Sequence, residues 1–147
     1  MSGASQGPSN RPLARLQARA RAPPLKPRFL RQLSGLVDLR VRSLRFSNDF
    51  LRNLPPGLLR LGLLRLFPGQ LSAKGMDCLA SRCPDLELLD LSDSGESVEP
   101  SWFAPLSPLT RLTGLILAGC TQVDDGCCLV LGQMTSLQLL VLDDCDL

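Results

Sequence analysis

The chain contains no histidine and no tyrosine, and it has a single tryptophan. Without histidine it lacks the usual general base and the commonest metal ligand. The adjacent carboxylates Asp124–Asp125 and Asp143–Asp144 point apart on a strand or turn, so neither pair suits acid–base catalysis. The cysteines include no C-x-x-C pair with a distant matching pair, as a zinc site would need. We therefore expect a protein that is not an enzyme, with no cofactor, no metal and no small-molecule substrate.

Long apolar runs are also missing, because Arg60 and Arg65 interrupt the richest stretch, residues 58–67. The sequence shows no hydrophobic secretory signal and no Asn-x-Ser/Thr site. Under these conditions we expect the six cysteines to be reduced thiols rather than a disulfide framework. The predicted location is cytoplasmic or nuclear, with no membrane partner.

Acidic residues are scarce in the first part of the chain. Residues 1–64 carry 12 of the 16 Lys and Arg but only two of the 14 Asp and Glu, Asp38 and Asp49. Residues 1–29 are rich in Ser, Gly, Pro, Ala and Arg and show no repeating apolar face, which predicts a disordered basic tail before a domain over residues 30–147. An alternative is a cleavable mitochondrial presequence. A nucleic-acid role is not favoured, because no aromatic residue precedes Phe29.

A repeated phrase carries most of the information in the remaining sequence. The pattern L-x-x-L-x-L-x-x-C occurs from Leu112 to Cys120 and again, one repeat later, from Leu137 to Cys145. Stepping backwards at nearly the same period places three weaker copies at Leu86, Leu61 and Leu36. Because side chains alternate on a strand, phrase positions 4 and 6 should point into one core. A small side chain such as Cys, Ser or Gly fits the turn at position 9.

The segments between the phrases should return as helices. Residues 71–80 offer Ser72 as an N-cap, followed by apolar residues at helical spacing. Residues 123–131 show the same pattern, with Asp125 as an acidic cap. After the third phrase, several prolines predict an irregular loop with Trp102 and Phe103 tucked beneath it. Phosphorylation of Ser94 or Ser97 in this loop is an alternative to a purely structural role.

These phrases resemble the cysteine-containing subclass of leucine-rich repeats found in F-box/LRR proteins, the substrate receptors of SCF-type ubiquitin ligases. The resemblance covers residues 33–147 and is sharpest over residues 71–92 and 118–125. It implies an α/β leucine-rich repeat solenoid, a horseshoe arc of about five repeats, with parallel strands on the concave side and helices on the convex side. It also implies a protein-binding role, with SCF components as candidate partners. The F-box motif of that family, however, is not found in this sequence.

The concave face should be lined by phrase positions 3, 5 and 7, which point away from the core. If the repeated phrase keeps the same spacing throughout, the predicted partner-binding residues change from basic to apolar along the chain. They are Arg40, Arg42, Arg65, Phe67, Asp90, Ile116, Leu139 and Val141. We expect a protein partner with an acidic patch against the arginines and an apolar segment over Ile116 and Val141.

The last phrase is followed at once by Leu147, with no helix to cover its leucines. This predicts that the chain is a fragment or short isoform with an adhesive open end, prone to self-association.

Overall fold

The computed structural model describes residues 15–19, 27–42, 45 and 47–146. Its centre is a parallel sheet of six strands whose spatial order is the same as their order in the chain. The strands are β1 (Arg15–Arg19), β2 (Asp38–Arg42), β3 (Arg60–Leu64), β4 (Leu88–Asp90), β5 (Gly114–Ile116) and β6 (Leu139–Val141). The α/β class and the parallel strands predicted from the sequence are confirmed.

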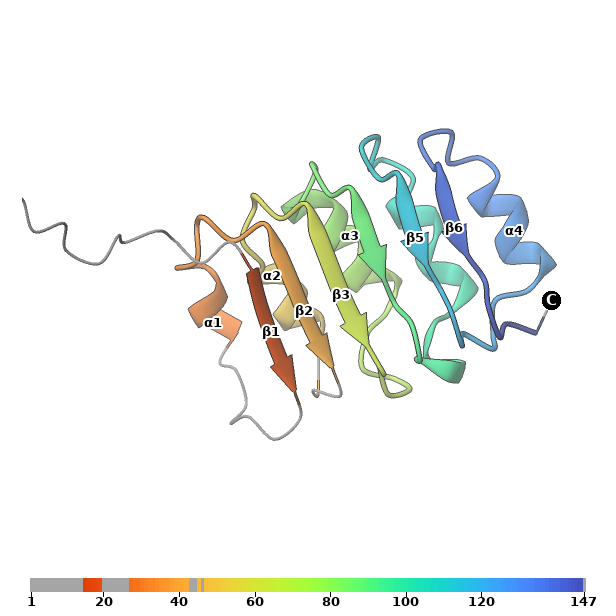
Figure 1. Cartoon of the computed structure of the whole chain (residues 1–147), viewed down its shortest axis with the longest axis horizontal. Helices are drawn as coiled ribbons and strands as arrows, with labels where there is room; N and C mark the ends of the chain where they lie inside the picture. The colour runs from red at the N-terminus through yellow and green to blue at the C-terminus, as the bar shows by residue number, and fades with distance from the viewer. Residues whose placement is uncertain (1–14, 20–26, 43–44, 46, 147) are drawn as a thin grey trace, which may run out of the picture.

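Helices α2, α3 and α4 lie behind the sheet in the view of Figure 1, so within the described residues the other face of the sheet is open. The helices are α1 (Pro27–Leu30), α2 (Asn48–Arg52), α3 (Ala73–Arg82) and α4 (Asp125–Leu131), together with the short 3₁₀ helices η1 (Gly95–Ser97), η2 (Pro100–Trp102) and η3 (Ala104–Leu106). No helix in the described residues is long and apolar enough to cross a membrane.

The core lies between the sheet and its connections. Phrase positions 4 and 6 supply pairs such as Leu89 and Leu91, or Leu115 and Leu117, all fully buried. The predicted helix over residues 71–80 is observed as α3, with Met76 and Leu79 fully buried. The period-two pattern of the strands and the period-3.6 pattern of α3 thus bury their apolar residues in one layer.

The loop between β4 and β5 is irregular, as its prolines predict, and consists of η1, η2 and η3. Trp102 and Phe103 are buried beneath it, which confirms that expectation. Ser94 and Ser97 are also buried, and the Ser97 hydroxyl donates to the Leu66 carbonyl at 2.9 Å. A kinase cannot reach either side chain in this fold, so the phosphorylation alternative is wrong for the folded chain.

The N-terminal segment differs from the expectation of a disordered tail. Residues 15–19 form β1, which pairs with β2, and α1 begins at Pro27. Leu16 packs against the core at the position that Leu39 occupies in β2, which explains why this short basic segment can join the sheet. The rest of the proposed tail, residues 1–14 and 20–26, lies outside the described residues.

Strand register corrects the placement of the second phrase. Leu61 pairs with Leu39 and with Leu89, so it occupies position 4 and the phrase begins at Leu58. The step from Asp38 to its equivalent Arg60 is therefore shorter than the other repeats, and the step from Arg60 to Leu88 is longer. The assumption of a constant period was wrong at this one repeat.

Candidate functional site

The open face of the sheet is the candidate site, because the elements that follow each strand cover only the other face (Figure 1). Three positions of each strand phrase point to it, and strand pairing aligns them in rows. Position 3 gives Asp38, Arg60, Leu88, Gly114 and Leu139; position 5 gives Arg40, Gly62, Asp90, Ile116 and Val141. By the same register, position 7 gives Arg42, Leu64, Ser92, Ala118 and Asp143.

Six of the eight predicted partner-binding residues lie on this face: Arg40, Arg42, Asp90, Ile116, Leu139 and Val141. Arg65 and Phe67 do not, because β3 ends at Leu64. The corrected register puts Gly62 and Leu64 in their places. The centre of the face is consequently less basic than the sequence suggested.

Arg65 belongs to a row of residues that turn the chain away from the strand ends. Arg65, Asp93, Gly119 and Asp144 all occupy position 8, and their φ angles are 57°, 60°, 70° and 56°. Residues other than Gly, Asn and Asp rarely adopt this left-handed backbone. The N–H groups of Arg65 and Asp93 still bond to the carbonyls of Ser92 and Ala118, at 3.1 and 2.8 Å.

Position 9 lies under this turn, and its polar side chains bond to a neighbouring repeat. The thiols of Cys120 and Cys145 donate to the carbonyls of Leu91 and Leu117, at 3.3 and 3.2 Å. Burial raises the pKa of Cys120 to about 12. These cysteines therefore act as small hydrogen-bond donors at the turn, where the phrase predicted a small side chain.

Basic side chains gather over Asp38 at the N-terminal end of the face. Its carboxylate is 1% exposed and lies within 2.8 Å of Arg15, 3.3 Å of Arg60 and 3.6 Å of Arg40. Burial opposes ionisation, but hydrogen bonds from Arg15 and Arg60 outweigh it and lower the pKa of Asp38. Arg15 and Arg60 were not among the predicted residues, because one lay in the assumed tail and the other in the shifted repeat.

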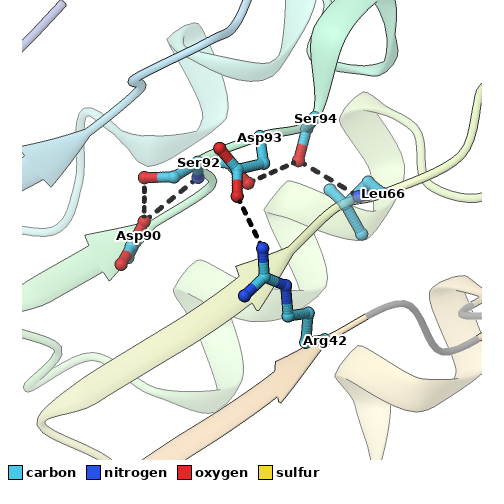
Figure 2. A network of polar contacts seen from close by, with 6 residues as sticks. All are labelled: Arg42, Leu66, Asp90, Ser92, Asp93 and Ser94. Atoms are coloured by element: carbon cyan, nitrogen blue, oxygen red, sulfur yellow. Dashed lines mark hydrogen bonds and ion pairs between the residues drawn. The ribbon is translucent and has the colours of Figure 1, made fainter. Parts of the chain in front are cut away.

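Acidic groups interrupt the middle of the face. Figure 2 shows Arg42 paired with Asp93 at 3.0 Å, next to Asp90, whose Oδ1 accepts from the hydroxyl and the N–H of Ser92. Behind them the Ser94 hydroxyl accepts from the N–H of Leu66 at 3.1 Å and ties the turns of two repeats together. This network fixes the charges at the end of β4.

Apolar side chains dominate the C-terminal end. Ile116 and Val141 are half-buried neighbours in adjacent strands, and Leu139 is 49% exposed. Leu140, which occupies the core position 4, is 39% exposed, while its counterparts in β2 to β5 are buried. Within the described residues no group of three or more Cys, Asp or Glu side chains could hold a metal ion.

Comparison with known proteins identifies the architecture and no family. No family model and no curated protein matches the chain. Among solved structures it is similar to the tropomodulin C-terminal domain of Caenorhabditis elegans, with 12% identity and a TM-score of 0.58 over 79% of this chain and 78% of that one. At this identity the likeness shows a shared fold alone: an α/β repeat-like arrangement around a parallel sheet.

Proposed function

We propose that this chain is a non-enzymatic, protein-binding leucine-rich repeat module, a solenoid arc that takes its partner on the open face of the sheet. The supporting observation is the grading of that face, from the arginines around Asp38 to the apolar residues Ile116, Leu139 and Val141. An exposed apolar patch beside a charged rim is typical of a protein-binding surface.

A non-enzymatic role fits the chemistry of the same face. Asp38 and Asp93 are in ion pairs with arginines, and Asp90 accepts hydrogen bonds from Ser92. A catalytic carboxylate must be within reach of a substrate proton and have a pKa near the working pH. Asp38 is buried, and its pKa is lowered rather than raised.

The resemblance to F-box/LRR proteins supports a narrower proposal, in which the chain recognises substrates for an SCF-type ubiquitin ligase. The position-9 cysteines that carry this resemblance bond in the same way in two successive repeats. The corresponding location is cytoplasmic or nuclear. Co-purification of the SCF adaptor and cullin with the tagged chain is the expected result, and a purified set of partners without either would count against the ligase role.

Affinity capture with matched variants tests the binding face. Ile116→Asp puts a charge on the apolar part of the face and should weaken partner capture by about tenfold or more. Lys74→Glu changes an exposed residue of α3 on the other side of the sheet and should leave capture unchanged. If Lys74→Glu reduces capture more than Ile116→Asp does, the binding face is wrongly assigned.

The second candidate is a mitochondrial or structural assembly factor with the same fold and a cleavable basic presequence. Its support is the basic, acid-free N-terminal segment. Cleavage near Leu25 would also remove β1 and the Arg15 guanidinium that covers Asp38. N-terminal sequencing of the mature protein distinguishes the two, because retention of β1 excludes such cleavage.

A further inference from the structure

Three guanidinium groups share one carboxylate at the N-terminal end of the open face. Arg15, Arg40 and Arg60 come from three adjacent strands, and their side chains are 60%, 38% and 43% exposed. Asp38 beneath them is 1% exposed. The cluster therefore presents cations to solvent while its single anion is hidden.

The arginines have more donors than Asp38 can accept. Each guanidinium has five N–H donors, whereas one carboxylate offers about four lone-pair sites. The contacts to Asp38 use Nε and one terminal nitrogen of Arg15, and Nε alone of Arg40 and Arg60. Both hydrogen bonds go to Asp38 Oδ2, whereas Oδ1 accepts none and lies 3.6 Å from Arg40 Nε. The other guanidinium N–H groups have no acceptor among the described residues, and a second carboxylate would satisfy them.

The rest of the face indicates a peptide rather than a nucleic acid. The open-face positions of β2 to β6 include no aromatic residue on which a base could stack. Asp90 and Asp93 would repel a phosphate backbone that continued past β3. Beyond them Ile116, Val141 and Leu139 offer an apolar surface instead.

The distance between strands sets how far apart the contact residues must be along a bound peptide. Adjacent strands lie about 4.8 Å apart, and an extended peptide advances about 3.4 Å per residue. From Arg40 on β2, Ile116 lies three strands away, or about four peptide residues, and Val141 four strands away, or about six. Alternate residues of an extended chain face the same side, so positions i, i+4 and i+6 can all contact the sheet.

We propose that the open face binds an extended acidic–apolar segment of a partner protein, lying across the strands. The segment places Asp or Glu at position i over Arg15, Arg40 and Arg60, and apolar residues at i+4 and i+6 over Ile116 and Val141. This assignment rests on the proposed function and specifies the chemistry of the partner.

A displayed library of random dodecapeptides, selected on the full chain, tests this proposal. Enriched peptides should carry the acidic residue and the apolar residues four and six positions later. For one selected peptide, measured by fluorescence anisotropy, replacing the acid by its amide should weaken binding by about tenfold. The same replacement should change binding to Arg40→Gln/Arg60→Gln by less than about twofold, because the two changes remove one interaction.

Two further variants control for folding and for charge alone. Arg40→Lys keeps the charge but loses the planar fork, so its loss of affinity should be smaller than that of Arg40→Gln. Lys74→Gln removes a cation from α3 and should bind like the wild type. Circular dichroism and thermal melting identify any variant that has unfolded.

Each alternative result would contradict a specific part of the proposal. Peptides that lose binding with Ile116→Asp but need no acid would overturn the acidic–apolar assignment and keep the binding face. Selection of no peptide, or of peptides insensitive to Ile116→Asp, would overturn the proposed function as well. Binding of single-stranded RNA that Arg40→Gln/Arg60→Gln abolishes would reassign the arginines to nucleic acid.

Discussion

Asp38 is a buried anion that holds three cations on an otherwise exposed face. Asp38→Asn keeps the shape of the side chain but leaves Arg15, Arg40 and Arg60 without a counter-charge. Because the carboxylate is buried while the guanidiniums are half exposed, we expect a loss of about 1–2 kcal/mol in the free energy of unfolding. Urea unfolding at pH 7 measures it.

The difference in the free energy of unfolding between wild type and Asp38→Asn should change with pH in a definite direction. The pKa of Asp38 is lowered from its ordinary value of 3.8, so the stabilisation is complete well above that value. It decreases as pH falls through the folded-state pKa, since the unfolded chain takes up the proton first. The gap between wild type and Asp38→Asn should therefore narrow in acid. Asp85→Asn, at an exposed ion pair with Arg111, is the control and should cost less than about 1 kcal/mol at either pH.

The six cysteines should separate into two kinetic groups. Cys83, Cys120 and Cys127 are buried, and burial raises the pKa of Cys83 and of Cys120 to about 12. Since the thiolate is the reactive form, these thiols should react slowly with a disulfide reagent in the native protein at pH 8. Cys78, Cys128 and Cys145 are partly exposed and should react first.

Denatured protein should titrate all six thiols as free, which checks the total. Labelling of native Cys120 as fast as that of Cys78 would contradict its burial. Cys145 is less protected than Cys120 because it lies in the last strand phrase, where only one neighbouring repeat covers it in the described chain.

At the scale of elements, the packing of α2 against α3 depends on one glycine. Asn48 and Ser72 exchange two hydrogen bonds across the helix starts, at 2.9 and 3.2 Å, and Gly75 faces them. A Cβ at position 75 would overlap the Asn48 side-chain oxygen. We expect Gly75→Ala to destabilise the fold by about 1–3 kcal/mol, although alanine favours helices.

Thermal or urea unfolding measures this effect, with Lys74→Ala as the exposed neighbour that should change stability by less than about 0.5 kcal/mol. A Gly75→Ala protein as stable as the wild type would show that Asn48 can move away without cost. The Ser72 hydroxyl makes no capping hydrogen bond to α3 and instead accepts from the Asn48 side chain. The sequence placed the N-cap of α3 correctly but could not show this partner.

Secondary-structure elements were predicted best where the sequence pattern fits only one structure. α3 and the loop over Trp102 follow from helical spacing and from proline, and both are observed. In the second repeat, residues 58–66 contain leucines at both odd and even positions, so the repeated phrase can be placed there in two ways. The frame of constant period placed Gly69 at position 9, which looked right for a tight turn, whereas the structure has Leu66 there. Alternation of Leu61 and Leu63 with Arg60 and Gly62 was the better signal.

β1 was missed for a different reason. Leu13 and Leu16 match positions 1 and 4 of a phrase one repeat before Leu36, but the surrounding Ser, Pro and Arg obscured them. Only the pairing of β1 with β2 brings Arg15 to Asp38. Arg15 could therefore not be predicted as part of the basic cluster, because its place there depends on tertiary pairing rather than on local sequence.

For the whole molecule, charge and apolar contact should act on different rate constants of binding. Arg40→Glu with Arg60→Glu should slow association with a captured partner by about tenfold and reduce the dependence of that rate on salt. Ile116→Asp should mainly accelerate dissociation. Surface plasmon resonance between about 50 and 300 mM salt separates the two, over the range in which screening becomes strong.

Lys74→Glu serves again as the control on the helical side. An association rate that is unchanged by the arginine substitutions at low salt would mean that the basic cluster does not guide the partner. Arg60 rather than Arg65 is the residue to substitute, because the register puts Arg60 on the face and β3 ends at Leu64.

The order of the sheet determines how the molecule opens. Among the described residues each strand bonds only to its neighbours in the chain, so β1 and β6 each have one bonded partner there and the inner strands have two. Amide hydrogens should therefore exchange fastest at the two ends and slowest in β3 and β4, a profile measurable by mass spectrometry. A peptide lying from β2 to β6 would join five strands that otherwise open one after another, and exchange should slow together across all of them.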